Sequence, residues 1–264
     1  MRTPVAVAIA LLAAHATPLA AQATRDRPSL VFTISGAYLD GVGLWTVPDQ
    51  PVSDNSFGTL IDHFLLRRSV KRTLGASLSA TYYRGAHLGF SGEAFLLGLG
   101  YDDGCTIAEP AQSALNVDVC NSIDHLERSA AAVTVSGGLV YRIGAGEFIS
   151  PFARIGAGIL INNQSSLLVV GRTGNGAELV IYDDDNTGPR VRPALSLGVG
   201  ATAAAGRGYQ IRWEIRDNIV GIERVTGPSV SRGAVPPHET AYKHLLSINL
   251  GVDVILERHP GRRY

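Results

Sequence analysis

Eight charged residues stand at regular positions in segments where apolar and polar residues alternate, and they are the first candidates for chemistry. They are Glu93, Arg142, Arg154, Arg192, Arg212, Glu214, Arg216 and Asp253. Alternate residues of a β-strand point to opposite faces, so these side chains share the polar faces of their strands. If those faces are enclosed, each charge needs a partner, because an isolated buried charge is costly. The residues therefore predict a network of arginine–carboxylate pairs that fills an interior. If water enters instead, five arginines against three carboxylates would favour the passage of anions.

Histidine, serine and carboxylate side chains are the next candidates, because together they can hydrolyse esters. His244 and Ser247 lie in one alternating segment, three positions apart. Residues at that spacing face opposite sides of a strand, which argues against a catalytic dyad. His238-Glu239 and Asp124-His125 fall in polar connecting segments, where an exposed histidine is common. We therefore expect a protein without enzymatic activity or catalytic residues. A barrel enzyme that modifies membrane lipid is the alternative.

Metal and cofactor sites have weak support in the sequence. The acidic run Asp183-Asp184-Asp185-Asn186 offers the hard oxygen ligands that Ca²⁺ prefers. It lacks the glycine and the closing glutamate of an EF-hand loop, so a solvated turn is the simpler interpretation. The Gly-x-Gly stretches at 98–100 and 198–200 lie in alternating segments that no helical segment follows, which argues against a dinucleotide site. We expect no metal and no cofactor.

Cys105 and Cys120 are the two cysteines of the chain. A small, even number of cysteines in an exported protein predicts a disulfide. The closed loop would contain the polar segment between them. In the chain-entropy model, closing a loop of this length stabilises the fold by about 3 kcal/mol.

Export is predicted by the first 23 residues. Met1-Arg2 precedes an apolar, alanine-rich run at 5–14, and the stretch 19–23 reads Leu-Ala-Ala-Gln-Ala. A positive start, a short apolar run and small residues at the cleavage site describe a signal peptide. We expect cleavage after Ala23, which leaves 24–264 as one domain.

Composition argues against a nucleic-acid partner. The chain carries 23 basic and 23 acidic residues, and no run of lysine or arginine marks a binding patch. After the signal peptide, no apolar run reaches the ~18 residues that a transmembrane helix needs. If the protein crosses a membrane, a closed barrel is the remaining way to pair every backbone polar group.

The periodicity of the chain is two, which indicates β-strands. In 209–216, apolar residues at odd positions oppose polar or charged residues at even positions, and 246–256 repeats the pattern. Six further segments alternate in the same way: 29–39, 73–84, 87–101, 129–143, 149–162 and 190–204. The alternation blurs at Leu96-Leu97, which allows for a bulge there.

The connections between these segments alternate strictly between short and long. Short, glycine-bearing turns lie near 84–86, 144–147 and 205–208, and long connections cover 40–72, 102–128, 163–189 and 217–240. Outer-membrane barrels have short periplasmic turns and long external loops, and an even strand number returns both termini to the periplasm. We therefore predict an all-β fold, a closed antiparallel up-and-down transmembrane β-barrel of about eight strands.

Two long connections could hold structure of their own. Leu60 to Val70 could form a short helix or an extra strand, and a crossing strand there would raise the count to ten. The apolar stretches 166–170 and 178–182 flank a glycine-rich turn. They predict a hairpin that extends the fifth and sixth strands beyond the membrane.

With this architecture the sequence resembles the small bacterial outer-membrane β-barrel proteins of the OmpA/OmpX type, over 30–256. The last strand adds a local feature that resembles the barrel-assembly signal of that family. Its matching residues are Asn249, Gly251, Val254 and Leu256. The family usually ends on an aromatic residue directly after this strand, whereas here 257–263 intervene before Tyr264. The resemblance implies partners in the barrel-assembly machinery, in periplasmic chaperones, and in outer-membrane lipid and lipopolysaccharide.

We therefore expect a monomeric, non-enzymatic barrel in the Gram-negative outer membrane, with a role in envelope structure, surface interaction or minor permeability. The rival is a soluble, lipocalin-like barrel that binds an apolar ligand. The two differ in facing, because the rival turns its apolar face inward. Aromatic residues near strand ends would form interfacial girdles in the membrane protein. The candidates are Tyr38, Trp45, Tyr82, Tyr101, Phe148, Phe152, Tyr209, Trp213 and Tyr242.

Overall fold

The structure is a computed structural model of the whole chain. It describes residues 28–54, 60–108, 110–111, 113–124, 127–128, 131–144, 148–162, 165–184, 190–206 and 208–257. The signal peptide predicted for 1–23 lies outside these residues. Among the helices of the described part, none is long and apolar enough to cross a membrane.

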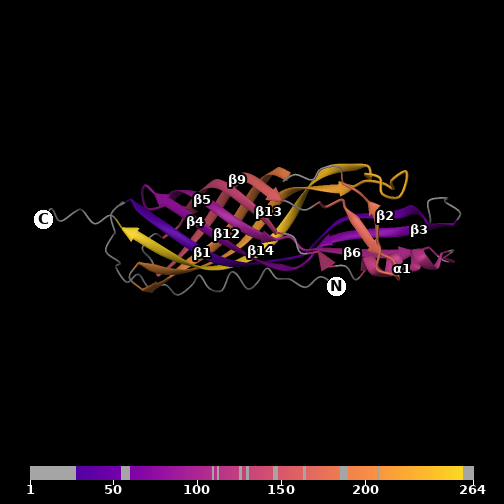
Figure 1. Cartoon of the computed structure of the whole chain (residues 1–264). Helices are drawn as coiled ribbons and strands as arrows, with labels where there is room; N and C mark the ends of the chain where they lie inside the picture. Colours follow the sequence, from indigo (N-terminus) through magenta and orange to yellow (C-terminus); the bar gives the residue numbers. More distant parts are fainter. Residues whose placement is uncertain are drawn as a thin grey trace, which may run out of the picture.

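Eight antiparallel strands close into a barrel in the order β1-β14-β13-β12-β9-β8-β5-β4 (Figure 1). They are β1 (Ser29–Leu39), β4 (Thr73–Tyr83), β5 (Leu88–Gly98), β8 (Ala131–Arg142), β9 (Ile149–Asn162), β12 (Arg190–Gly206), β13 (Tyr209–Val225) and β14 (His238–Glu257). The first and last strands pair from Ser29↔Glu257 to Leu39↔Ser247, which closes the sheet. The eight-stranded barrel predicted from the periodicity is confirmed.

The apolar faces of the strands point outward. Along β13, Ile211, Trp213 and Ile215 are each about half exposed, whereas the alternate residues Arg212 and Glu214 are buried. β14 repeats this facing with Ile248, Leu250 and Val252 outside. An apolar exterior around a charged interior is the arrangement of a transmembrane barrel. The inverted facing that a lipocalin-like barrel requires is therefore wrong for this chain.

The stretch 60–70 does not cross the barrel. It forms β3 (Ile61–Val70), which belongs to a second sheet of order β2-β3-β6-β7 with β2 (Val42–Ser53), β6 (Tyr101–Ile107) and β7 (Glu127–Arg128). The ten-stranded alternative is therefore wrong. The residues that suggested a crossing strand serve this smaller sheet.

A helix and a hairpin complete the part outside the barrel. α1 (Ala114–Asp124) follows β6, and β10 (Val169–Arg172) pairs with β11 (Glu178–Tyr182) in a sheet of their own. The hairpin expected at 166–182 is present, but it is separate from the barrel strands and does not extend them. We call the assembly of β2, β3, β6, β7, α1, β10 and β11 the head; Figure 1 shows it beyond one end of the barrel.

β13 and β14 run past the barrel and reach the head. Their pairing continues from Tyr209↔Val254 to Val225↔His238, whereas β12 pairs with β13 only as far as Val220. Strand structure therefore occupies much of 217–240, which the sequence assigned to a loop. The remaining connection touches the head, because Gln50 Oε1 accepts from the Ser229 amide at 2.7 Å and Gln50 Nε2 donates to the Ser229 carbonyl at 3.4 Å.

One apolar core joins the barrel to the head. Leu39, Phe95 and Leu160 line the barrel interior at its head end, and they belong to the same buried cluster as Trp45 and Phe64 of the head. Because the cluster is continuous, the head is packed onto the barrel and is not a set of separate loops.

The aromatic residues divide between the two environments. Tyr38, Tyr82, Phe148, Tyr209, Trp213 and Tyr242 are exposed on the outside. Trp45 and Tyr101 are buried in the head, and Phe152 is buried inside the barrel. The girdle prediction was wrong for these three, because their strands turn them toward the core.

A charge on the outward face tests the facing. We expect Trp213→Arg to lower the stability of the barrel in lipid vesicles by about 2–4 kcal/mol, since the cation would enter hydrocarbon. The measurement is urea unfolding followed by the heat-modifiability shift on a gel. Tyr242→Arg, near the head-side end of β14, should cost about 0–1 kcal/mol. Equal losses for the two variants would contradict a lipid-facing Trp213.

Candidate functional site: the charged interior and the head

The centre of the barrel holds a compact ion-pair network. Arg154 Nη1 donates to Glu93 Oε2 at 2.6 Å, and Arg216 Nη1 donates to Glu93 Oε1. Arg216 Nε also donates to Glu214 Oε1 at 2.9 Å. The four side chains come from β5, β9 and β13, and each is at most 4% exposed. Three strands are thus joined inside the barrel by charge-assisted hydrogen bonds.

The network continues toward the turn end of the barrel. Arg212 Nε donates to Asp253 Oδ1 at 3.1 Å, and the Thr33 hydroxyl donates to the same oxygen at 2.7 Å. Arg212 Nη1 lies 3.9 Å from Glu214 Oε2, which links the two halves. Arg154, Arg212 and Arg216 therefore face Glu93, Glu214 and Asp253, and the formal charges of the network cancel.

The other two predicted lumen arginines lie outside the central network. Arg142 stacks on the Tyr83 ring, 3.9 Å from its centroid, and donates to the Ala86 carbonyl at 2.6 Å. Arg192 pairs with Glu223 at the head end. The excess of five arginines over three carboxylates, inferred from the sequence, does not exist as a single charged surface.

Apolar layers lie on both sides of the network. Val31, Tyr83, Val140 and Phe152 form a buried cluster at the turn end. At the head end, inward-facing Phe95 and Leu97 of β5 follow Glu93 and are at most 1% exposed. The register of β5 with both neighbours is regular, so the blurred alternation at Leu96-Leu97 is not a bulge. Inside and outside are both apolar at this level of the barrel.

Gly198 gives the network its room. A Cβ at this position would lie 2.2 Å from Glu214 Oε1 and 3.0 Å from Arg154 Cγ. Any side chain here would displace the ion pairs. The Gly-x-Gly stretch of β12 therefore has a packing role in the lumen.

The head contains a second buried ion pair that sequence reasoning missed. Arg68 Nε donates to Asp103 Oδ1 at 2.5 Å, and its Nη2 donates to the Leu168 carbonyl at 2.7 Å. The guanidinium lies over the rings of Trp45 and Tyr101, at 5.4 and 5.3 Å. A signal was available, because Arg68 shares the strand face of Phe64 and Leu66, where a charge requires a partner. Burial also raises the pKa of the Tyr101 hydroxyl, which fits a dry core.

The acidic run joins a cluster between barrel and head. Asp184 pairs with Arg190, whose Nε lies 3.1 Å from Glu223 Oε2. Asp185 and Asn186 lie outside the described residues. Asp184 is therefore committed to a structural ion pair, and no group of three metal-ligating side chains occurs in the described part of the chain.

The two histidine candidates that the structure describes, His244 and His238, make other contacts than the catalytic pairs considered from the sequence. His244 is exposed on the outside, with Nδ1 2.7 Å from Asp217 Oδ2, whereas Ser247 is 1% exposed and faces the lumen. The opposite facing expected for this pair is thus observed. His238 Nδ1 contacts the carbonyl of Pro236, and His125 lies outside the described residues.

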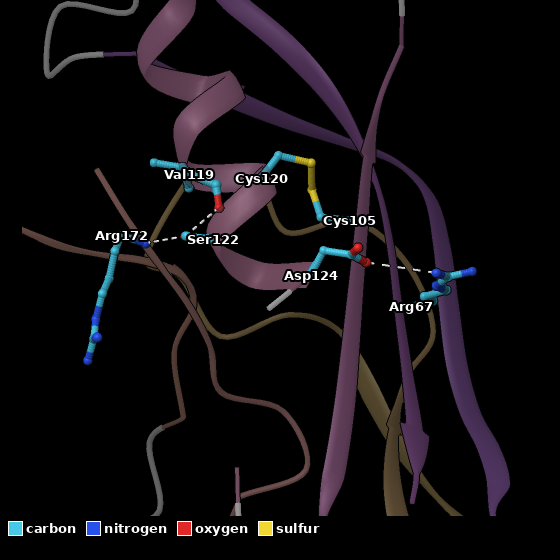
Figure 2. Close-up of a disulfide and its surroundings, with 7 residues drawn as sticks. All are labelled: Arg67, Cys105, Val119, Cys120, Ser122, Asp124 and Arg172. Atoms are coloured by element: carbon cyan, nitrogen blue, oxygen red, sulfur yellow. Dashed lines mark hydrogen bonds and ion pairs between the residues drawn. A yellow bond between two sulfur atoms is a disulfide. The ribbon is translucent and has the colours of Figure 1, made fainter. Parts of the chain in front are cut away.

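The disulfide predicted from the two cysteines is present. It joins Cys105 of β6 to Cys120 of α1, with Cα atoms 5.3 Å apart (Figure 2). Ser122 donates to the Val119 carbonyl and accepts from the Arg172 amide, which ties α1 to β10. The helix is therefore held from two sides within the head.

The residues of the assembly signal lie on β14. Asn249 is buried in the lumen, and a Cβ at Gly251 would lie 2.5 Å from the Ile34 carbonyl oxygen. Val254 is half-buried and Leu256 is exposed on the outside. Their role in assembly stays a prediction.

No protein-family model matches the sequence, and no curated protein matches it. Several solved structures are similar to it over most of the chain. The outer membrane protein AlkL has a TM-score of 0.47 and 13% identity, and the match covers 94% of this chain and 98% of AlkL. The outer membrane protein OprG from Pseudomonas aeruginosa has a TM-score of 0.45 and 9% identity, and the match covers 88% of this chain and 98% of OprG. Ail of Yersinia pestis, in complex with the heparin analogue sucrose octasulfate, has a TM-score of 0.42 and 13% identity. The match covers 87% of this chain and 99% of Ail.

These likenesses concern the general barrel fold and nothing finer. The closed sheet, its apolar exterior and its charged interior are themselves features of an outer-membrane β-barrel. The protein therefore has the architecture of a β-barrel of that membrane.

Removing one arginine of the central network should destabilise the barrel, because the charges of the network would no longer cancel. We expect Arg216→Met to destabilise the barrel by about 3–5 kcal/mol, because Glu93 and Glu214 would lose a buried counter-charge. Urea unfolding in lipid vesicles measures the change. Adding Glu214→Gln should restore some of the loss.

Arg142→Met is the matched control, since it removes an arginine whose contacts are a ring and a carbonyl. It should cost less than Arg216→Met. A larger or equal loss for Arg142→Met would contradict the assigned network.

Proposed function

We propose that this protein is a sealed, non-enzymatic outer-membrane barrel that presents a folded head at the cell surface for contact with molecules outside. The observation that carries the proposal is the continuous core between barrel and head, above a neutral ion-pair network. A pore needs a wet path through the barrel, whereas ion pairs and apolar side chains occupy this interior.

The filled interior supports an anchoring role over permeability. An eight-stranded barrel is just wide enough for its side chains to fill the lumen. Here Phe95 and Leu97 close the head side, and Tyr83 and Phe152 close the turn side. To pass, a hydrated ion would have to displace both apolar layers and a set of mutually neutralised charges.

The head supports a contact role. Its strands and helix share a hydrophobic core, a buried Arg68–Asp103 pair and a disulfide. A surface held this firmly loses little conformational entropy when it binds a partner, which favours affinity. A barrel with flexible loops would also be anchored in the envelope, but it would lack a rigid surface of this kind.

Conductance tests the sealed barrel. We expect the purified protein in a planar bilayer to show no discrete steps at physiological salt. A variant with both Glu93→Ala and Arg216→Ala removes one charge of each sign and empties space in the lumen, so it should leak. Discrete steps from the unmodified protein would overturn the sealed interior. Liposome swelling in a small sugar checks the unmodified protein independently of that variant.

Thiol labelling of intact cells tests which side the head faces. The native cysteines are bonded to each other, so an introduced cysteine is the sole reactive thiol among the described residues. Val230→Cys, at a side chain 96% exposed beside the head, should react with a membrane-impermeant maleimide. Arg84→Cys, in a short turn, should react only after the outer membrane is opened. The reverse pattern would refute a head at the cell surface.

A further inference from the structure

The outer face of the head sheet holds a trough next to the barrel. Three adjoining depressions, of about 440, 430 and 350 Å³, all include Ser69 in their walls. Gly43 and Gly104 border Ser69 on the neighbouring strands, where they pair with Ser69 and Arg67. We call the surface formed by Gly41, Gly43, Ser69 and Gly104 the trough.

Small residues shape the trough for the side chains around it. A Cβ at Gly104 would lie 2.1 Å from Arg67 Nε, so glycine lets this arginine lie flat across β6. A Cβ at Gly41 would lie 2.6 Å from the Val70 carbonyl oxygen. The chain therefore approaches itself closely here and leaves a shallow surface bordered by long cationic side chains.

Four cations from three segments of the chain surround the trough. Arg67 lies on β3, Lys71 and Arg72 link β3 to β4, and Lys243 of β14 donates to the Gly43 carbonyl at 2.9 Å. Three carboxylates stand among them, so the described side chains of this border carry a surplus of one positive charge. The carboxylates are those of Asp40, Asp102 and Asp124.

The ion pairs at this border are weak enough to yield to a ligand. Arg67 Nη2 lies 3.8 Å from Asp124 Oδ1, beyond hydrogen-bond distance, as Figure 2 shows across β6. Arg72 pairs with Asp40 at 3.0 Å, but both side chains are more than half exposed. Exposed pairs of this kind contribute little to stability, so a phosphate can compete for the arginines.

The trough lies just above the lipid-facing band. Leu74, at the head-side end of β4, is 76% exposed, and Tyr38 on the adjacent β1 is 46% exposed. Arg72 precedes Leu74 by two residues, or roughly 7 Å along an extended chain, and Arg67 precedes it by seven, or roughly 23 Å. A lipid whose acyl chains lie against Leu74 would therefore bring its headgroup to Arg72.

This spacing selects a class of lipid. The headgroup region adds only about 5–8 Å to each side of the hydrocarbon core, so a simple phospholipid would reach Arg72 but not Arg67. A headgroup built of phosphorylated sugars can contact both arginines and lie across the small residues between them. We propose that the trough binds the phosphorylated saccharide headgroup of an outer-leaflet glycolipid. This rests on the proposed function, which places the head outside.

The test uses the full-length mature protein in detergent, titrated with rough-type lipopolysaccharide, with the same lipopolysaccharide after dephosphorylation, and with inorganic phosphate. We expect the phosphorylated glycolipid to bind at least about tenfold more tightly than the dephosphorylated one, as charge-assisted hydrogen bonds imply. The double variant Arg67→Ala/Arg72→Ala should lose this preference. Inorganic phosphate should bind weakly to every variant.

Arg172→Ala/Arg224→Ala is the matched control, since it also removes two exposed arginines of the same protein. Figure 2 shows Arg172 on the other side of α1 from Arg67. The control should keep the preference, and all variants should keep the heat-modifiability shift of a folded barrel. Equal binding of the two lipopolysaccharides, or equal losses in the two double variants, would overturn the proposal. If Val230→Cys labels from outside and lipid preference is absent, the trough assignment fails while the surface role stands.

Discussion

The requirement that every enclosed charge be neutralised shapes the interior of this barrel. In an eight-stranded barrel there is little space for water, so a lone arginine or carboxylate inside would be unstable. Three arginines and three carboxylates meet that requirement together, over β5, β9, β13 and β14. The small Gly198 and the hydroxyl of Thr33 follow from it, since one makes space for Glu214 and the other bonds Asp253. The apolar layers on both sides then exclude water and make each pair depend more strongly on its partners.

The same principle recurs in the head with different surroundings. Arg68 and Asp103 are buried between aromatic rings, and Arg190 binds Asp184 and Glu223 where the head meets the barrel. These pairs fix the relative positions of segments that lie far apart in the sequence. Leu39 and Leu97 of the barrel pack in the same core as Trp45. Burial, not loop length, therefore determines that the long connections form one body with the barrel.

Much of the barrel could be predicted because its outside and inside differ in polarity. The alternation in 209–216 and 246–256 is the direct record of a lipid-facing side and a charged side. The prediction weakened where that contrast ends. At Leu96-Leu97 both faces are apolar, because the inward residue enters the core shared with the head, so a regular strand looked like a bulge. β3 looked like an extra barrel strand for a related reason, since Phe64 and Leu66 pack on the head core. Sequence periodicity records that a face is buried, but not what buries it.

The sequence predicts that the enclosed charges must pair, but it does not predict which residues pair with one another. Arg142 and Arg192 share strand parity with the network residues, yet the tilt of the strands separates them from it. When paired residues are followed from strand to strand once around the barrel, the path that starts at Thr73 of β4 returns to β4 at Tyr83. The strands are therefore staggered by ten residues per circuit. Residues at similar distances from their strand ends therefore lie at different levels of the barrel.

The same stagger accounts for the surface near the trough. Arg72 reaches the rim beside Asp40, the residue that follows β1, whereas Lys243 reaches Gly43 from a strand that continues into the head. Long strands that leave the barrel at different levels thus gather cations from distant segments of the sequence at one place above the lipid.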